Sequence, residues 1–189
     1  YRFAGSDMTL FKDFQKYFGY TKECRMETTY RFGEPLIQKS SKFILHNPDQ
    51  KSKSVRPFKS DVNTRLEFVG TSDKSETVDR VIGIINSLPQ DSEIYVLGRY
   101  SFNVAIFKDS PIAIKNTTSK VTLEYNGRTM TYMTVHQSKG LECDYVILLG
   151  CDSGSFGFPA DISDPPVLKY VLSKPDGYQF GEERRVFYV

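Results

Sequence analysis

Several residue types that mark whole classes of protein are scarce in this 189-residue sequence or absent from it. It has no tryptophan, two histidines and three cysteines (Cys24, Cys143 and Cys151), which form neither a CxxC pair nor a Cys/His metal spacing. This argues against a zinc site and a disulfide framework, and for a reducing compartment in which we expect buried thiols. No apolar run approaches the about 20 residues of a membrane-spanning helix, so we expect a cytoplasmic protein without a membrane partner.

A strong charge of either sign is also lacking. The 25 Lys and Arg residues against 23 Asp and Glu give a formal net charge of +2. A polyanionic partner such as nucleic acid is neither demanded nor excluded, and any contact with one must be local. The length suits one large domain, and the sequence opens on Tyr1 without an initiator methionine and stops inside the helical pattern "EERRVFYV". We therefore expect a piece of a longer protein.

What the sequence does contain is an alternation of helix and strand patterns. Apolar residues at helical spacing predict helices over residues 6–19, 34–47, 72–88 and 182–189. Strands are predicted over residues 24–32, 64–71, 93–99 and 144–150, and Asn-Gly predicts a hairpin within 121–135. Residues 47–60 are rich in Lys, Ser, Asn and Pro and read as a loop. Strands separated by helices predict an α/β fold, with a mostly parallel sheet flanked by helices.

In such sheets, ligands gather beyond the carboxyl ends of the strands. The polar residues that follow "YVLGR" and "TYMTV" there are Arg99, His136, Lys139 and Glu142. The stretch "HQSKGLE" fits a capped helix start, with Thr134 or Ser138 as the cap and surface charges behind it. It equally fits a phosphate site, because Gly140 follows Lys139 where a helix start would offer free N–H groups. These residues alone leave both interpretations open.

Four segments, in order along the chain, resemble motifs of the UvrD/Rep-type superfamily 1 DNA helicases, and most closely the helicase IV-like branch. "YRFAGSD" is similar to the end of the motif joining two RecA-like domains, and "ETTYRFGEP" to the aromatic-arginine motif early in the second domain. "TVHQSKGLECDYVILLG" resembles a later motif of that domain, and "GEERRVFYV" the beginning of the last one. The resemblance implies that residues 1–189 are a three-layer, second RecA-like domain truncated at both ends within motifs. The family's large helical insertion is then absent or reduced to a hairpin near 111–133.

The resemblance also implies roles for residues of these motifs. Arg31 matches the arginine that reaches the γ-phosphate of ATP bound on the partner domain, a task that suits a planar, permanent cation. Glu142 matches the acidic residue that meets the nucleotide ribose, and Gly140 lets the backbone come close. DNA contacts are implied at Tyr1, Phe3, Arg99, Thr134, His136, Ser138 and Lys139.

Several of the DNA contacts have an ordinary alternative. Tyr1 and Phe3 match positions at which the family stacks bases, but apolar packing would use them equally well. His136 is either a phosphate donor or a structural histidine, and Lys139 faces either phosphate or solvent. Arg99 and Asn103 are further apart in sequence than the family's arginine-x-asparagine pattern, which leaves Asn103 without an assigned role.

The 189 residues contain no G-x-x-x-x-G-K-[ST] phosphate loop and no acidic magnesium-binding motif. The resemblance therefore implies that ATP and Mg²⁺ are held by a missing first RecA-like domain of the same protein, that this piece alone is inactive, and that it needs no metal ligands of its own. The full-length parent is then expected to be an ATP-dependent DNA helicase that moves 3′ to 5′ on single-stranded DNA. Two alternatives stand beside this one: the motor module of a helicase-nuclease or DNA repair complex, and a non-catalytic nucleic-acid-binding relic.

Overall fold

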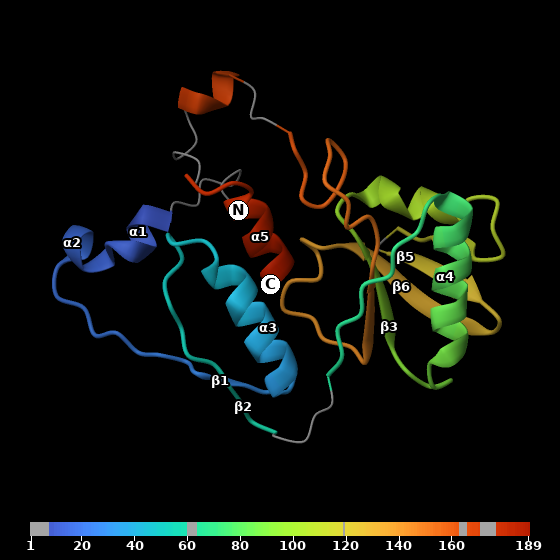
Figure 1. The fold of residues 1–189 in the computed structure, drawn as a ribbon, viewed down its shortest axis with the longest axis horizontal. Coiled ribbons are helices and arrows are strands. Elements are labelled where there is room, and N and C mark those ends of the chain that lie inside the picture. Colours follow the sequence, from blue (N-terminus) through green and yellow to red (C-terminus); the bar gives the residue numbers. More distant parts are fainter. Residues whose placement is uncertain (1–7, 60–63, 119, 163–165, 171–176) are drawn as a thin grey trace. The chain divides into compact units, whose positions relative to one another are not determined.

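The computed structural model of the chain describes residues 8–59, 64–118, 120–162, 166–170 and 177–189. Tyr1 and Phe3, two of the expected DNA contacts, lie outside the described residues. The chain divides into two compact units (Figure 1). The first unit comprises Tyr1–Leu66 and Ile162–Tyr188, and the second comprises Glu67–Asp161 together with Val189.

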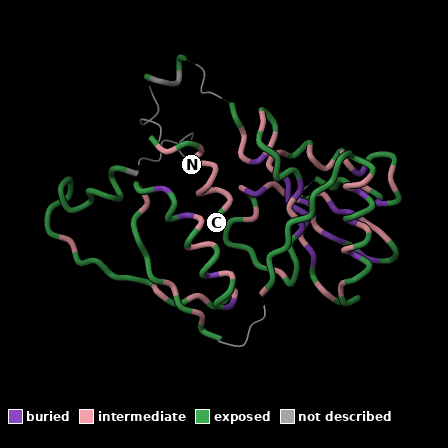
Figure 2. The backbone as a smooth tube through the Cα atoms, in the orientation of Figure 1, coloured by how far each residue is buried: buried purple, intermediate pink, exposed green. Residues whose placement is uncertain are grey.

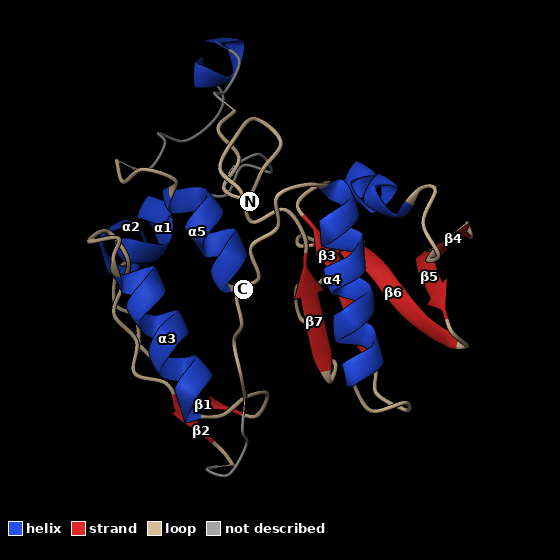
Figure 3. Ribbon diagram, turned by 45° about the vertical axis from the view of Figure 1, so that its right-hand side comes forward, coloured by secondary structure: helices blue, strands red, loops and turns tan. Residues whose placement is uncertain are grey.

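The second unit is built on a five-stranded sheet with the strand order β4-β5-β6-β3-β7 (Figure 3). Its strands are β3 (Ile94–Gly98), β4 (Ala113–Asn116), β5 (Val121–Tyr125), β6 (Arg128–Thr134) and β7 (Tyr145–Leu148). β3 pairs in parallel with β6 and with β7, whereas β4 with β5 and β5 with β6 are antiparallel. The α/β class is confirmed. A mostly parallel sheet is not, because the predicted hairpin folds back within the sheet and makes it mixed.

One helix supplies most of the helical side of the core in the second unit. α4 (Lys74–Ser87) begins at Asp73, whose carboxylate accepts a hydrogen bond from the Glu76 N–H at 2.9 Å. Val78, Val81 and Ile85 recur at helical spacing along α4 and are buried. They pack with strand residues and with Phe107 of the 3-10 helix η2 (Ser101–Phe107) into one core. The buried stretches of the second unit gather in its interior (Figure 2). The prediction of a capped helix over residues 72–88 is confirmed.

The first unit holds two packed helices, α3 (Glu34–Leu45) and α5 (Gly181–Tyr188). The rings of Phe43 and Phe187 lie 5.3 Å apart, and the Arg184 guanidinium lies 4.8 Å from the centre of the Phe43 ring. These contacts join segments far apart in sequence, and both helices were predicted. The other elements are α1 (Met8–Lys12), α2 (Phe14–Phe18), β1 (Thr28–Thr29), β2 (Arg56–Pro57) and η3 (Pro166–Tyr170).

Three predictions for individual segments, and the one for the cysteines, are wrong. The helix expected over residues 6–19 is interrupted, so that α1 and α2 are separate, and its apolar side chains (Leu10, Phe11, Phe14, Phe18) are exposed. Residues 64–71 form no strand, whereas β2 arises inside the expected loop 47–60, because it finds a parallel partner in β1. The thiols are not a buried set, since Cys24 and Cys151 are exposed and Cys143 is intermediate.

No described helix has the length and apolar character needed to cross a membrane.

Candidate functional site at the carboxyl edge of the sheet

Three neighbouring parallel strands of the second unit end at the same edge of the sheet. Gly98 at the end of β3 lies opposite Thr134 at the end of β6, and Leu97 lies opposite Leu148 of β7. The pairing continues one residue further on each side: Val135 N–H donates to the Gly98 carbonyl at 3.0 Å and Leu149 N–H to the Leu97 carbonyl at 2.9 Å. The segments after Gly98, Thr134 and Leu148 therefore leave the sheet side by side (Figure 3).

The stretch after β6 forms consecutive turns, so the helix start that both sequence interpretations assumed is not present. Ser138 N–H donates to the Thr134 carbonyl at 3.1 Å, and Leu141 N–H to the Ser138 carbonyl at 3.0 Å. Gly140 has a φ of 86°, in the left-handed region that favours glycine. The glycine therefore serves to turn the chain between β6 and β7. A helix dipole is not available here to attract a phosphate.

The two hydroxyls of the turn are used to hold it together. Thr134 donates from its N–H and from its hydroxyl to the Gln137 amide oxygen, at 2.9 and 3.0 Å. The Ser138 hydroxyl donates to the Val135 carbonyl at 3.0 Å. Gln137 was missed in the sequence, although the spacing Thr-x-x-Gln is that of a capping box and points to this bond.

The turn also carries the remaining candidates of this segment. His136 is half-buried, while Lys139, Gly140 and Glu142 are exposed. With Arg99, they lie on segments that leave the same edge of the sheet. The structure thus brings together the expected contacts of the second unit, and their roles stay predictions.

The segment after β3 is held rigidly where it leaves the sheet. The Tyr100 N–H donates to the Asn103 side-chain oxygen at 2.7 Å, and the Tyr132 hydroxyl donates to the Tyr100 carbonyl at 2.6 Å. Asn103 thus has a structural role at the start of η2. A side chain at Gly98 would collide with the Tyr132 hydroxyl, so glycine is required for this close approach. Burial raises the pKa of Tyr132 to about 12, which keeps it a neutral donor.

Arg99 comes directly before this anchored residue. Its guanidinium lies 4.9 Å from the centre of the Tyr100 ring, a cation–π distance. Arg99 is half-buried and leaves the sheet beside the turn that follows β6.

Arg31, the remaining candidate, belongs to the first unit and lies between β1 and α3. Its N–H approaches the Thr29 hydroxyl at 3.4 Å, and its side chain is exposed. Gly33, two residues on, is buried and donates its N–H to the Thr64 hydroxyl at 3.2 Å. The backbone on both sides of Arg31 is thus fixed, and an exposed guanidinium is presented between β1 and α3.

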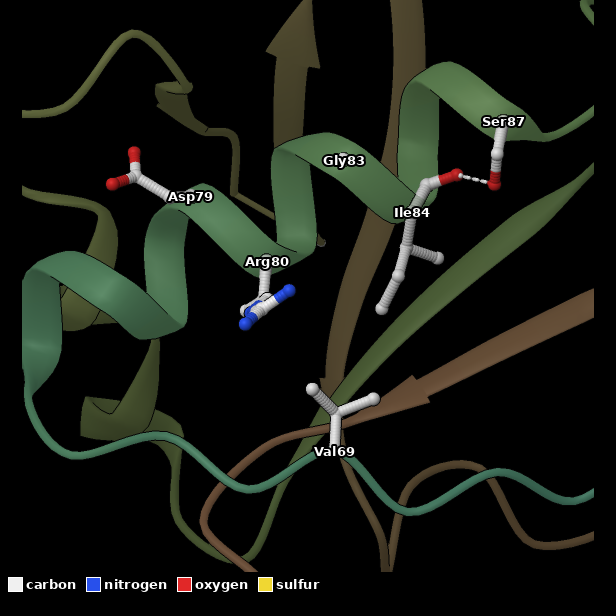
Figure 4. A pocket seen from close by; sticks show the side chains of 6 residues that line it. All are labelled: Val69, Asp79, Arg80, Gly83, Ile84 and Ser87. Atoms are coloured by element: carbon white, nitrogen blue, oxygen red, sulfur yellow. Dashed lines mark hydrogen bonds between the residues drawn. The ribbon is translucent and has the colours of Figure 1, made fainter.

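The part of the chain that the structure describes holds a hollow elsewhere and lacks a metal-binding cluster. Within it, no group of three or more His, Cys, Asp and Glu side chains is arranged to hold a metal ion. A hollow of about 290 Å³ lies on the outer side of α4, where Val69 faces the helix (Figure 4). Its lining comprises Val69, Asp79, Arg80, Gly83, Ile84 and Ser87, none of which belongs to the segments at the strand ends.

Comparison with known proteins bears on the same edge of the sheet. Residues 102–189, which include the turn and β7, match the family model described as UvrD-like helicase C-terminal domain. The chain is 31% identical over 189 residues to DNA helicase IV of Escherichia coli (strain K12), and it spans 26% of that protein. It therefore covers about a quarter of this relative's length. No solved structure matches the chain.

Proposed function

We propose that residues 1–189 are the second RecA-like motor domain of an ATP-dependent DNA helicase. The premise is that this chain belongs to the UvrD/Rep-type helicases, through a UvrD-like helicase C-terminal domain over residues 102–189. One observation carries the proposal. Within a helicase domain, β6, β3 and β7 end side by side and bring Arg99, the 134–142 turn and the segment after β7 to one edge. The hairpin near residues 111–133 replaces the larger helical insertion of relatives.

On the nucleotide side, Arg31 acts as the arginine finger. A guanidinium carries a permanent charge, and charge develops on the phosphoryl oxygens during transfer, so the contact strengthens in the transition state. The exposure of Arg31 on a fixed backbone supports this role, because the ATP would be bound on another domain. The Glu142 carboxylate accepts hydrogen bonds from the ribose hydroxyls, and Gly140 lets the backbone approach the nucleotide. ATP and Mg²⁺ are held chiefly by a first RecA-like domain of the same protein.

On the nucleic-acid side, Arg99, His136 and Lys139 contact the backbone of single-stranded DNA. Thr134 and Ser138 contribute through the turn, because their hydroxyls already donate to Gln137 and to the Val135 carbonyl. Their hydrogen bonds hold the turn in the shape in which it meets the phosphates. Tyr1 and Phe3 complete the contact by stacking on bases.

The motor cycle follows from this division of labour. ATP closes the two RecA-like domains, and release of the products opens them, so grips on the strand strengthen and weaken in alternation. The protein then moves 3′ to 5′ along single-stranded DNA. The ribose contact at Glu142 and the DNA contacts at His136 and Lys139 follow β6 within one short segment, which is a direct route for coupling them.

The test is Arg31→Ala in the complete protein, with Arg25→Ala as the matched control. Arg25 is an exposed arginine of the same unit and pairs with Glu23 at 3.1 Å. We expect DNA-stimulated kcat to fall by about 10³-fold or more in Arg31→Ala, with nucleotide affinity changed only a few fold. Arg25→Ala should hydrolyse ATP like the wild type. A fall of less than about tenfold in Arg31→Ala would refute the finger assignment.

A further inference from the structure

Three aromatic side chains of the second unit form a cluster at the carboxyl edge of the sheet. The rings of Tyr100 and Phe102 stack at 5.0 Å with an interplanar angle of 6°. Phe156 meets both rings edge-on, at 6.1 Å from Tyr100 and 5.7 Å from Phe102. Despite these contacts, Phe102 is 52% exposed and Phe156 is 64% exposed. We call Tyr100, Phe102 and Phe156 the aromatic cluster.

The fold holds the first two rings of the cluster in place. Tyr100 is bound through its N–H by Asn103 and through its carbonyl by Tyr132. Phe102 lies in the first turn of η2, whose other end is fixed by the buried Phe107. The stacked pair is therefore presented by a rigid segment.

The third ring comes from a compact loop after β7. Phe158 is 3% exposed, and its N–H donates to the Asp152 carbonyl at 2.8 Å. The Asp161 N–H donates to the Gly154 carbonyl at 2.9 Å, which closes the loop around Phe156. A side chain at Gly157 would collide with the Asp152 carbonyl, so the loop depends on glycine there. The exposed Phe156 is thus held by buried neighbours and backbone bonds.

A ligand for this cluster must offer flat apolar faces next to negative charge. Exposing two phenylalanine side chains is unfavourable by the hydrophobic effect, and stacking on a flat partner relieves that cost. Arg99 adds a cation over the Tyr100 ring, at 4.9 Å from its centre. Nucleobases followed by phosphates have this combination, whereas an apolar protein helix offers flat or apolar contacts without the negative charge. Base–aromatic stacking contributes about 1–3 kcal/mol per base.

We propose that Tyr100, Phe102 and Phe156 form a platform on which bases of single-stranded DNA stack, with Arg99 held beside the platform for the adjoining phosphate. The inference deepens the proposed function and rests on it. It adds the exposed rings of Phe102 and Phe156 as base contacts, with Tyr100 stacked against Phe102, to a site whose other expected contacts meet the phosphate backbone or lie at the amino terminus of the chain. Because stacking does not distinguish bases, the platform gives a grip that tolerates any sequence.

The test compares Phe102→Leu/Phe156→Leu with the wild type in the complete protein, on an oligothymidine and on an abasic oligonucleotide of the same length. Leucine keeps the apolar bulk of the side chain and removes the flat face. We expect affinity for oligothymidine to fall by about 30-fold or more, the effect of losing two stacked bases, and affinity for the abasic strand to stay unchanged. The variant Phe102→Tyr/Phe156→Tyr, which keeps both flat rings, should bind oligothymidine with the affinity of the wild type. Phe68→Leu, which changes a 78% exposed phenylalanine of the same unit, should bind both strands like the wild type.

Each other result is decisive. Equal losses on the two oligonucleotides would overturn the platform, because the rings would then act through packing. Unchanged affinity of the leucine variant for oligothymidine would also overturn it and would favour a protein partner for the cluster. Failure of the wild type to bind either strand would instead refute the proposed function, and the platform with it.

Discussion

Replacing Arg128 by alanine is expected to lower the free energy of unfolding by about 3 kcal/mol. Arg128 is the first residue of β6 and is 7% exposed. Its guanidinium donates to the carbonyl of Ile85 at 2.6 Å and to that of Leu88 at 3.1 Å. It also donates to the carbonyls of Pro89 and Gln90 and to the Ser92 hydroxyl. One side chain thus binds carbonyls at and just beyond the end of α4, where the Ile85 carbonyl also accepts from the Leu88 N–H at 3.3 Å.

The magnitude follows from which carbonyls lose their donor. A hydrogen bond to a charged group contributes about 1.5–3 kcal/mol. Water is excluded most from the bonds to the Ile85 and Leu88 carbonyls, since Ile85 is buried and Leu88 is half-buried. Pro89 and Gln90 are exposed, so water replaces the guanidinium there at little cost. Two such bonds give about 3–6 kcal/mol. The expected loss lies at the lower end, about 3 kcal/mol, because the Ile85 carbonyl keeps the Leu88 N–H at 3.3 Å and water can reach the Leu88 carbonyl. Arg128→Lys should lose less than Arg128→Ala, because an ammonium group on a stem of similar reach still supplies some of the donors.

The assay is equilibrium unfolding of the chain in urea, followed by circular dichroism. Arg80→Ala is the control, since Arg80 lies on α4 but is exposed and pairs with Glu76 at only 3.5 Å. That variant should lose less than about 1 kcal/mol. If Arg128→Ala also loses less than about 1 kcal/mol, the account of how β6 is fastened to α4 is refuted.

Two further predictions concern the edge of the sheet. His136→Ala in the complete protein should weaken single-strand binding and reduce its salt dependence, while basal ATPase stays unchanged. If the variant and the wild type bind the strand with equal affinity at both of two salt concentrations, His136 has a structural role. Tyr132→Phe tests the buried phenol: because the pKa of Tyr132 is raised to about 12 from 10.0, its contribution to stability is complete below pH 10 and is lost as the pH rises towards 12. Unfolding measured at about pH 9 and pH 11.5 should show wild type and variant converging at the higher value, and a constant difference would contradict the buried phenol.

The elements that could be predicted from the sequence are those specified by neighbouring residues. α4 has its cap at Asp73 and its apolar face at Val78 and Val81, all within a few turns. The hairpin between β5 and β6 is turned by Asn126 and Gly127, whose φ values are 48° and 75°, as the Asn-Gly signal predicts.

The failures occur where distant parts of the chain decide. A strand needs a partner, and residues 64–71 have a strand-like composition without forming one, whereas β2 pairs with β1 from inside a polar segment. The apolar face expected in residues 6–19 is exposed. Periodicity in the sequence predicts such a face but does not show which part of the chain covers it. A mostly parallel sheet was expected from the alternation of elements, which did not reveal that the hairpin would join the same sheet.

The candidate site was predictable in its position and less so in its detail. The carboxyl ends of β3 and β6 lie together because the strands are parallel neighbours, which is why Arg99 and the 134–142 turn share an edge. The internal use of Thr134 and Ser138, the role of Gln137 and the aromatic cluster depend on side-chain packing. A sequence pattern carries no information on those contacts until the backbone is in place.

The most direct test of the central claim is ATP hydrolysis by the complete protein, with and without single-stranded DNA, beside the 189-residue chain under the same conditions. The account predicts turnover that single-stranded DNA stimulates in the complete protein, and none in the chain alone. Absence of turnover in the complete protein would contradict the motor assignment, and turnover by the chain alone would contradict an active site shared with a first RecA-like domain.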